Sequence, residues 1–169
     1  MVTMLTGLGR VSFLLLCLTV LAGPQFISAA NAGDAAMTAS FDGKPWTASF
    51  AQGTTLEMAG KPVLNLSGTQ QGSPTMTFNS MLVLKTPGDY VGTYPFGGGF
   101  PANGANFNIL DSGAMVGHVR FKSGEVVIET YDPAAKTISG HFSASGKDDD
   151  GKEADIKDGR FSGVLVSPQ

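Results

Sequence analysis

The sequence predicts an all-β domain, a single antiparallel sandwich or small barrel of roughly 8–10 strands. Three observations predict this fold class. Short runs of alternating apolar and polar residues, typical of strands with one buried face, recur from residue 37 to residue 166. Turn residues separate these runs at intervals of roughly 8–12 residues. No stretch between the turns has the period of about 3.6 residues that an amphipathic helix shows.

The first hairpin illustrates the pattern. The run 37–41 alternates, and Asp42-Gly43 follows it. This pair is a strong hairpin signal because both central residues of a type I′ turn need positive φ. Trp46 lies in register with Ala48 and Phe50 on the returning strand. We therefore expect Trp46 in the core.

Further strands follow along the chain. They are expected at 55–58, 62–68, 75–85, 105–110, 114–121, 124–131, 137–144 and 160–166. The segment Lys122-Ser123-Gly124 is expected to be the turn between two of them, and Asp158-Gly159 is expected to close the last hairpin.

Residues 1–32 have the order of a secretory signal peptide. Arg10 is the only charged side chain there, and the apolar run Val11–Leu21 follows it. Next come the helix breaker Gly23-Pro24 and small residues that end in Ala30-Asn31-Ala32. As a helix, the apolar run would be roughly 16 Å long, about half the thickness of a bilayer core. We expect cleavage after residue 32 and no stable membrane insertion of the mature chain.

The mature chain, residues 33–169, has the length of one domain. The single cysteine, Cys17, lies in the signal segment, so the mature chain has no disulfide and no thiolate ligand. Leu14-Leu15-Leu16 precedes Cys17 where a lipoprotein signal needs a small residue, so lipid anchoring is not expected. These features predict a secreted or periplasmic protein.

The charge pattern excludes some partners. The chain carries 11 basic and 14 acidic residues, a net charge of −3, without a basic patch. Nucleic acid is therefore not an expected partner. A glycine-rich loop leading from a strand into a helix, as needed for cradling phosphates, is not recognisable, and no cofactor is expected.

Aromatic residues gather around a predicted loop at residues 92–104, which is rich in glycine and proline. Aromatic faces on such a loop can stack on sugars or apolar ligands. The candidate ligand-binding residues are Tyr90, Tyr94, Phe96, Phe100 and Phe107. A flap that folds back over one end of the core is the alternative for the same residues.

The acidic run Lys147–Glu153 is the one candidate metal site, because calcium takes six to eight oxygen ligands. The candidate ligands are Asp148, Asp150 and Asp155. In an EF-hand alignment Gly146 and Lys157 would occupy the first and last ligand positions, which neither side chain can fill. We therefore expect a solvated hairpin tip and no tight calcium site.

Catalysis has little support. The two histidines, His118 and His141, lie on predicted strands, without a cysteine or a Gly-x-Ser-x-Gly motif that would supply a nucleophile. No catalytic residue is assigned.

Two sets of motifs resemble a known family. The opening one is the DGKxW pattern at Asp42–Trp46. The closing ones are Tyr131-Asp132, Lys136–Phe142 and Asp158–Val164. Together they resemble a family of small secreted or lipoprotein-like bacterial all-β domains of unknown function. The resemblance implies fold and compartment only, and this chain departs from the lipoprotein-like members because it lacks a usable lipobox.

The sequence favours an exported, non-catalytic β-domain, a binding or structural module for an unknown small molecule or protein. The alternative is a lipocalin-like carrier with an apolar cavity gated by the loop at 92–104. A histidine-dependent hydrolase ranks third.

Overall fold

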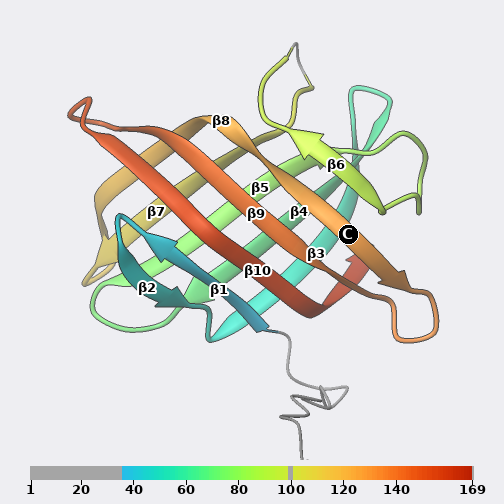
Figure 1. Ribbon diagram of the computed structural model, residues 1–169, viewed down its shortest axis with the longest axis horizontal. Helices are drawn as coiled ribbons and strands as arrows, with labels where there is room; N and C mark the ends of the chain where they lie inside the picture. Colours follow the sequence, from blue (N-terminus) through green and yellow to red (C-terminus); the bar gives the residue numbers. More distant parts are fainter. Residues whose placement is uncertain (1–35, 99–100, 169) are drawn as a thin grey trace, which may run out of the picture.

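The computed structural model describes residues 36–98 and 101–168, which form ten strands and contain no helix (Figure 1). The strands are β1 (Ala36–Phe41), β2 (Lys44–Thr47), β3 (Phe50–Met58), β4 (Lys61–Gln70), β5 (Thr75–Val83), β6 (Gly92–Pro95), β7 (Gly104–Asp111), β8 (Ala114–Asp132), β9 (Thr137–Asp148) and β10 (Glu153–Pro168). Within these ranges, no helix is long and apolar enough to span a membrane. The predicted signal peptide, residues 1–32, lies outside the described residues.

The strand pairings close on themselves. From β3 the antiparallel pairs run through β4, β5, β7, β8 and β9 to β10. The end of β10, Val166–Pro168, then pairs in parallel with Gly53, Thr54 and Thr55 of β3. The hairpin β1–β2 is attached to the first half of β10, and β6 to the second half of β8. The predicted all-β class is confirmed, and all pairs except β10–β3 are antiparallel.

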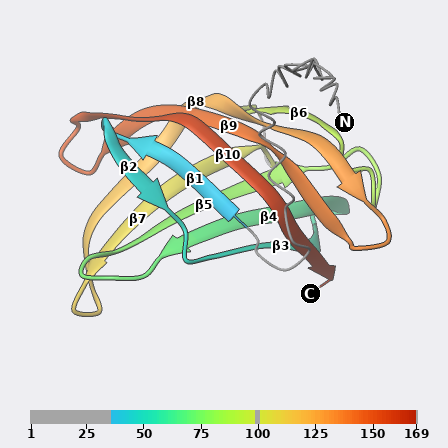
Figure 2. The same ribbon diagram turned by 60° about the horizontal axis from the view of Figure 1, so that its bottom comes forward.

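The closed sheet is flattened into two layers. In Figure 1, β9 and β10 cross in front of β3, β4 and β5, and Figure 2 shows the same two groups of strands one above the other. Aromatic side chains fill the space between the layers. Phe41 stacks on Phe107 with ring centroids 4.2 Å apart, and Phe78 stacks on Phe142 at 4.5 Å.

Trp46 is a core residue, as the sequence predicts. Its side chain is 2% exposed, and its ring meets the edge of Phe107 at a centroid distance of 5.7 Å. A Cβ on Gly68 of β4 would lie 2.9 Å from the Trp46 ring. Glycine is therefore needed at that position so that the β1–β2 hairpin can pack across the layer containing β4.

The first turn has the predicted geometry, but two other predicted turns are bulges inside long strands. Asp42 and Gly43 have φ of 48° and 75°, as a type I′ turn requires. In contrast, β8 runs through Lys122-Ser123-Gly124, and β10 runs through Asp158-Gly159, each with a shift in pairing register at that point. A glycine or aspartate with positive φ serves a bulge as well as a turn, so local sequence does not separate the two.

The predicted loop at 92–104 contains a strand. β6 pairs with Glu125–Ile128 of β8, which converts its first part into the edge of the sheet. Gly97 and Asn103 form an isolated bridge beyond it. Gly99 and Phe100 lie outside the described residues.

Candidate functional site

The predicted aromatic candidates do not form one open site. Phe107 is fully buried between the layers, and Tyr94 is 7% exposed. The Tyr94 hydroxyl donates to the carbonyl of Tyr90 at 2.7 Å. Burial, and secondarily the charge of Asp89, raises the pKa of Tyr94 to about 12. Phe107 therefore has no ring face free for a ligand, and the Tyr94 phenol is held inside the protein.

Tyr90 and Phe96 also pack against the core. Tyr90 meets the ring of Tyr131 edge-on at 4.7 Å, and burial, then the neighbouring Tyr131, raises the pKa of Tyr90. Phe96 is half-buried, and its backbone amide donates to the Gly124 carbonyl at 2.9 Å. The candidate Phe100 lies outside the described residues. The four described aromatic candidates therefore lie in the core or pack against it.

The acidic candidates occupy the turn between β9 and β10 and the strand after it. Asp148 Oδ1 accepts from the backbone amides of Asp150 at 3.0 Å and Lys152 at 2.8 Å, which closes the turn. Asp155 forms an ion pair with Lys157 at 2.7 Å. Among the residues described, no group of three or more His, Cys, Asp and Glu side chains is arranged to hold a metal ion.

The two histidines lie on the neighbouring strands β8 and β9, each beside a different carboxylate, and His141 is opposite Val127, nine residues along β8 from His118. His118 Nδ1 on β8 is 3.3 Å from Asp149 Oδ1, and His141 Nδ1 on β9 is 3.0 Å from Glu129 Oε1. The structure therefore does not bring them together as a pair.

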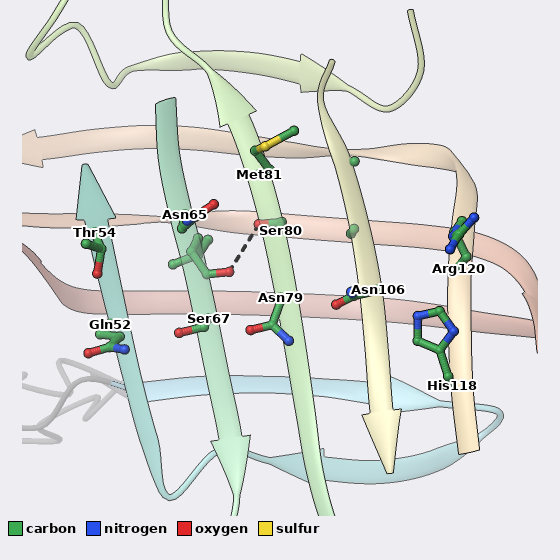
Figure 3. Close-up of a pocket in the computed structure, with 13 residues that line it drawn as sticks. Gln52, Thr54, Asn65, Ser67, Asn79, Ser80, Met81, Asn106, His118 and Arg120 are labelled. Carbon is green, nitrogen blue, oxygen red and sulfur yellow. Dashed lines mark hydrogen bonds between the residues drawn. The ribbon is translucent and has the colours of Figure 1, made fainter. Parts of the chain in front are cut away.

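A hollow of about 560 Å³ lies on the outer face of β3, β4, β5, β7 and β8 (Figure 3). Its volume is within the range of small-molecule sites in proteins. The side chains that line it are mostly amides and hydroxyls. The residues lining it are Gln52, Thr54, Asn65, Leu66, Ser67, Asn79, Ser80, Met81, Gly104, Ala105, Asn106, His118 and Arg120.

Strand register explains why these side chains share one face. Directly opposite residues point to the same side of a sheet. One such row crosses five neighbouring strands, as Figure 3 shows for its labelled side chains. It runs Gln52, Ser67, Asn79, Asn106 and Arg120. The neighbouring row runs Thr54, Asn65, Met81 and Gly104, where the missing side chain of glycine deepens the hollow.

Asn106 carries an unused hydrogen-bonding atom at this site. Its Oδ1 is buried and has no hydrogen-bond partner among the described residues. Leaving a buried acceptor without a donor costs about 1–3 kcal/mol, so native proteins rarely retain one. Ser80 is buried beneath the same face, and its hydroxyl is satisfied by the Leu66 carbonyl at 3.3 Å. A donor from outside would satisfy Asn106 Oδ1 once the amide group rotates toward the hollow, because the atom is buried as it stands.

Electrostatically the hollow is neutral over most of its length. Its titratable side chains are His118 and Arg120, both on β8 at one end. The carboxylate of Asp149 beside His118 brings a negative charge to that end. The floor between β3 and β7 contains no charged side chain.

Comparison with known proteins places the chain in a family. Residues 33–165 match the model of a family described as "Domain of unknown function (DUF6252)". The chain belongs to this family. No curated protein matches the chain, and no solved structure does.

The sequence reasoning missed the polar face of this DUF6252 domain. It treated the polar positions of each strand as solvent-facing and examined only aromatic and charged clusters. One signal was available: Asn65, Ser67, Asn79, Asn106 and Asn108 all occupy polar positions of alternating strands, where charged residues are more usual on a solvated face. Their assembly into one surface depends on register, which the sequence does not show.

Proposed function

We propose that this DUF6252 domain is an exported, non-catalytic binding domain, and that the hollow on the outer face of β3, β4, β5, β7 and β8 is its binding site. The observation that carries the proposal is the row of amide and hydroxyl side chains that lines the hollow across neighbouring strands, in which Asn106 Oδ1 has no hydrogen-bond partner among the described residues. An amide group presents a donor and an acceptor, so such a row can exchange several hydrogen bonds with a polar ligand.

The chemistry of the hollow supports binding rather than turnover. General acid–base catalysis needs at least one group with a suitable pKa close to the reacting bond. The only imidazole among the side chains lining the hollow is His118, which lies at one end beside Asp149. The amides and hydroxyls of the floor can bind and orient a ligand but do not act as acids or bases.

The alternative carrier role would place an apolar ligand between the two layers. That space holds the stacked pairs Phe41–Phe107 and Phe78–Phe142. A ligand would have to displace these rings, so we favour the outer face.

Export is part of the proposal and rests on the signal-like order of residues 1–32. The resemblance to secreted and lipoprotein-like bacterial domains supports the same compartment. Expression of the full chain in a bacterial host, fractionation and N-terminal sequencing test it. A mature chain that starts at Gly33 in the periplasm or medium is expected, whereas an uncleaved cytoplasmic chain would contradict export.

A stability measurement tests whether Asn106 serves binding. A residue retained for binding at a cost in stability can be replaced with a gain in stability. Asn106→Leu removes the unpaired acceptor at similar volume, so we expect the free energy of unfolding to rise by about 1 kcal/mol in urea denaturation. The matched control is Asn108→Leu, two residues along the same face of β7, which should give no such gain. A loss of stability in Asn106→Leu would assign Asn106 a structural role and contradict the proposal.

A further inference from the structure

We propose that the hollow binds a neutral oligosaccharide, which lies across the strands from Phe50 on β3 to Arg120 on β8. This inference rests on the proposed function of the hollow as a binding site. Three features of the outer face carry this inference: an exposed aromatic ring at one end, an uncharged amide floor, and a balanced charge at the other end.

Phe50 supplies the aromatic end. It is 54% exposed, and it lies two residues before Gln52 on β3. Alternate residues of a strand share a face, so Phe50 and Gln52 point to the same side. Ala51 and Gly53, which alternate with them, are buried. An exposed ring that extends a polar surface provides an apolar face on which the C–H face of a sugar ring can stack.

The amide side chains on the floor of the hollow can form hydrogen bonds with the hydroxyl groups of a sugar. A sugar hydroxyl both donates and accepts, and each amide side chain offers both functions. Gln52, Asn79 and Asn106 follow one another in the same row, with Ser67 between the first two. Rotation of the Asn106 amide would bring its Oδ1, which lacks a donor among the described residues, to a sugar hydroxyl that can donate to it. The hollow therefore suits a ligand with several hydroxyl groups along its length.

The Arg120 end favours a neutral ligand over an acidic one. A carboxylate placed there would be attracted by the guanidinium of Arg120 and repelled by the carboxylate of Asp149, whose Oδ1 lies 3.3 Å from His118 Nδ1 at the same end of the hollow. The two opposite charges offset each other, which reduces the net attraction for an acidic ligand. Arg120 can instead use its fixed set of donors on hydroxyl oxygens.

The length of the face fits an oligomer. β3 and β8 are separated by four strand spacings through β4, β5 and β7. At about 4.8 Å per spacing this is about 19 Å, the length of a few linked sugar rings rather than of one. The ligand would run across the strands, parallel to the row of amides.

Nuclear magnetic resonance of the ¹⁵N-labelled, exported chain tests the inference, because side-chain amide signals report each contact. The neutral probes are cellohexaose, maltohexaose and the hexamer of N-acetylglucosamine. The acidic probe is hexagalacturonate, and tetra-alanine and laurate represent other classes. We expect at least one neutral probe to shift the side-chain amide signals of Gln52, Asn79 and Asn106.

The outcomes separate the two proposals. If hexagalacturonate, tetra-alanine or laurate shifts these signals and no neutral saccharide does, the saccharide inference is wrong while the hollow remains a binding site. If none of the six probes shifts them, both the inference and the proposed function fail.

Two variants test the stacking contact. Phe50→Ala should weaken binding of the active neutral probe by about tenfold, since it removes the ring on which the sugar lies. The matched control is Leu165→Ala, because Leu165 is 52% exposed but lies on β10. Equal affinity of the Phe50→Ala variant and the wild type would contradict the proposed position of the saccharide.

Discussion

The outer face of β3, β4, β5 and β7 has no charged side chain along the centre of its strands, whereas the outer face of β8, β9 and β10 carries many charged side chains. The central outer residues of the first group are Gln52, Thr54, Asn65, Ser67, Thr69, Thr77, Asn79, Asn106 and Asn108. The second group carries the ion pairs Lys147–Glu153 at 2.8 Å and Lys157–Asp155 at 2.7 Å. His141 and Glu129 add a contact of 3.0 Å.

The two groups also differ in regularity. The pairs β3–β4, β4–β5 and β5–β7 keep one register throughout. The pairs β8–β9, β9–β10 and β1–β10 each contain at least one register shift. Bulges increase local twist and bend a strand, so the charged group supplies the curvature that closes the sheet. The regular group keeps its polar side chains aligned in rows. We infer that the charged, bulged group serves folding and solubility, and that the regular, uncharged group serves the proposed recognition.

The largest expected effect comes from removing the Trp46 side chain, which connects the two groups of strands. Trp46 belongs to the hairpin attached to β10, but its ring lies against Gly68 of β4 and Phe107 of β7. Trp46→Ala removes this buried ring and leaves a cavity. We expect the free energy of unfolding to fall by about 3–5 kcal/mol in urea denaturation followed by circular dichroism.

Phe50→Ala is the control for this prediction, because it removes an exposed ring and should change stability by only about 0.5 kcal/mol. Trp46 is the single tryptophan, so wild-type fluorescence reports its surroundings directly. An emission maximum typical of tryptophan in water would contradict its burial.

A pair of glycine substitutions tests the difference in regularity. A Cβ on Gly140 of β9 would overlap the carbonyl oxygen of Val127 on β8, whereas a Cβ on Gly104 of β7 would meet nothing within 4 Å. We expect Gly140→Ala to lower the free energy of unfolding by about 1–3 kcal/mol, since strands β8 and β9 must separate locally. Gly104→Ala should be almost neutral. Equal urea midpoints for the two variants would show that the close approach of β8 and β9 is not required.

The smallest expected effect is a loss of stability at high pH caused by Tyr94 on β6, the strand that pairs with β8. The folded-state pKa of Tyr94 is about 12, against an ordinary value of 10.0, so the unfolded chain loses its phenolic proton first as pH rises. The resulting contribution to stability is complete below pH 10 and is lost between pH 10 and about 12.

Urea denaturation at pH 9, 10 and 11 measures this loss. Tyr94→Phe has no phenolic proton at that position, so its stability should fall less steeply over the same range than that of the wild type. Parallel pH profiles for the two proteins would show that another group is responsible.

Much of the fold is local and could be predicted from the sequence. The alternation of apolar and polar residues determines which side of a strand is apolar. The all-β class and the burial of Trp46 can therefore be predicted from residues that are close together in the sequence. The Asp42-Gly43 turn is also local, because positive φ at both positions is a property of those two residues. The same local logic was wrong at Gly124 and Asp158, where the partner strand decides whether positive φ makes a turn or a bulge.

The candidate site depends on tertiary structure. The aromatic residues near 92–104 have the composition of a binding loop, but β6 pairs with β8, and the described rings pack inward. Gln52, Asn79 and Asn106 are far apart in sequence, and only the register of four strands brings them into one row. By itself the sequence determined which residues of a regular strand face outward, because alternation is local; Phe50 departs from this, since it alternates with Trp46 in the sequence but begins β3 and is 54% exposed. The tertiary structure decided which of them lie side by side, because strand pairing joins residues that the chain separates.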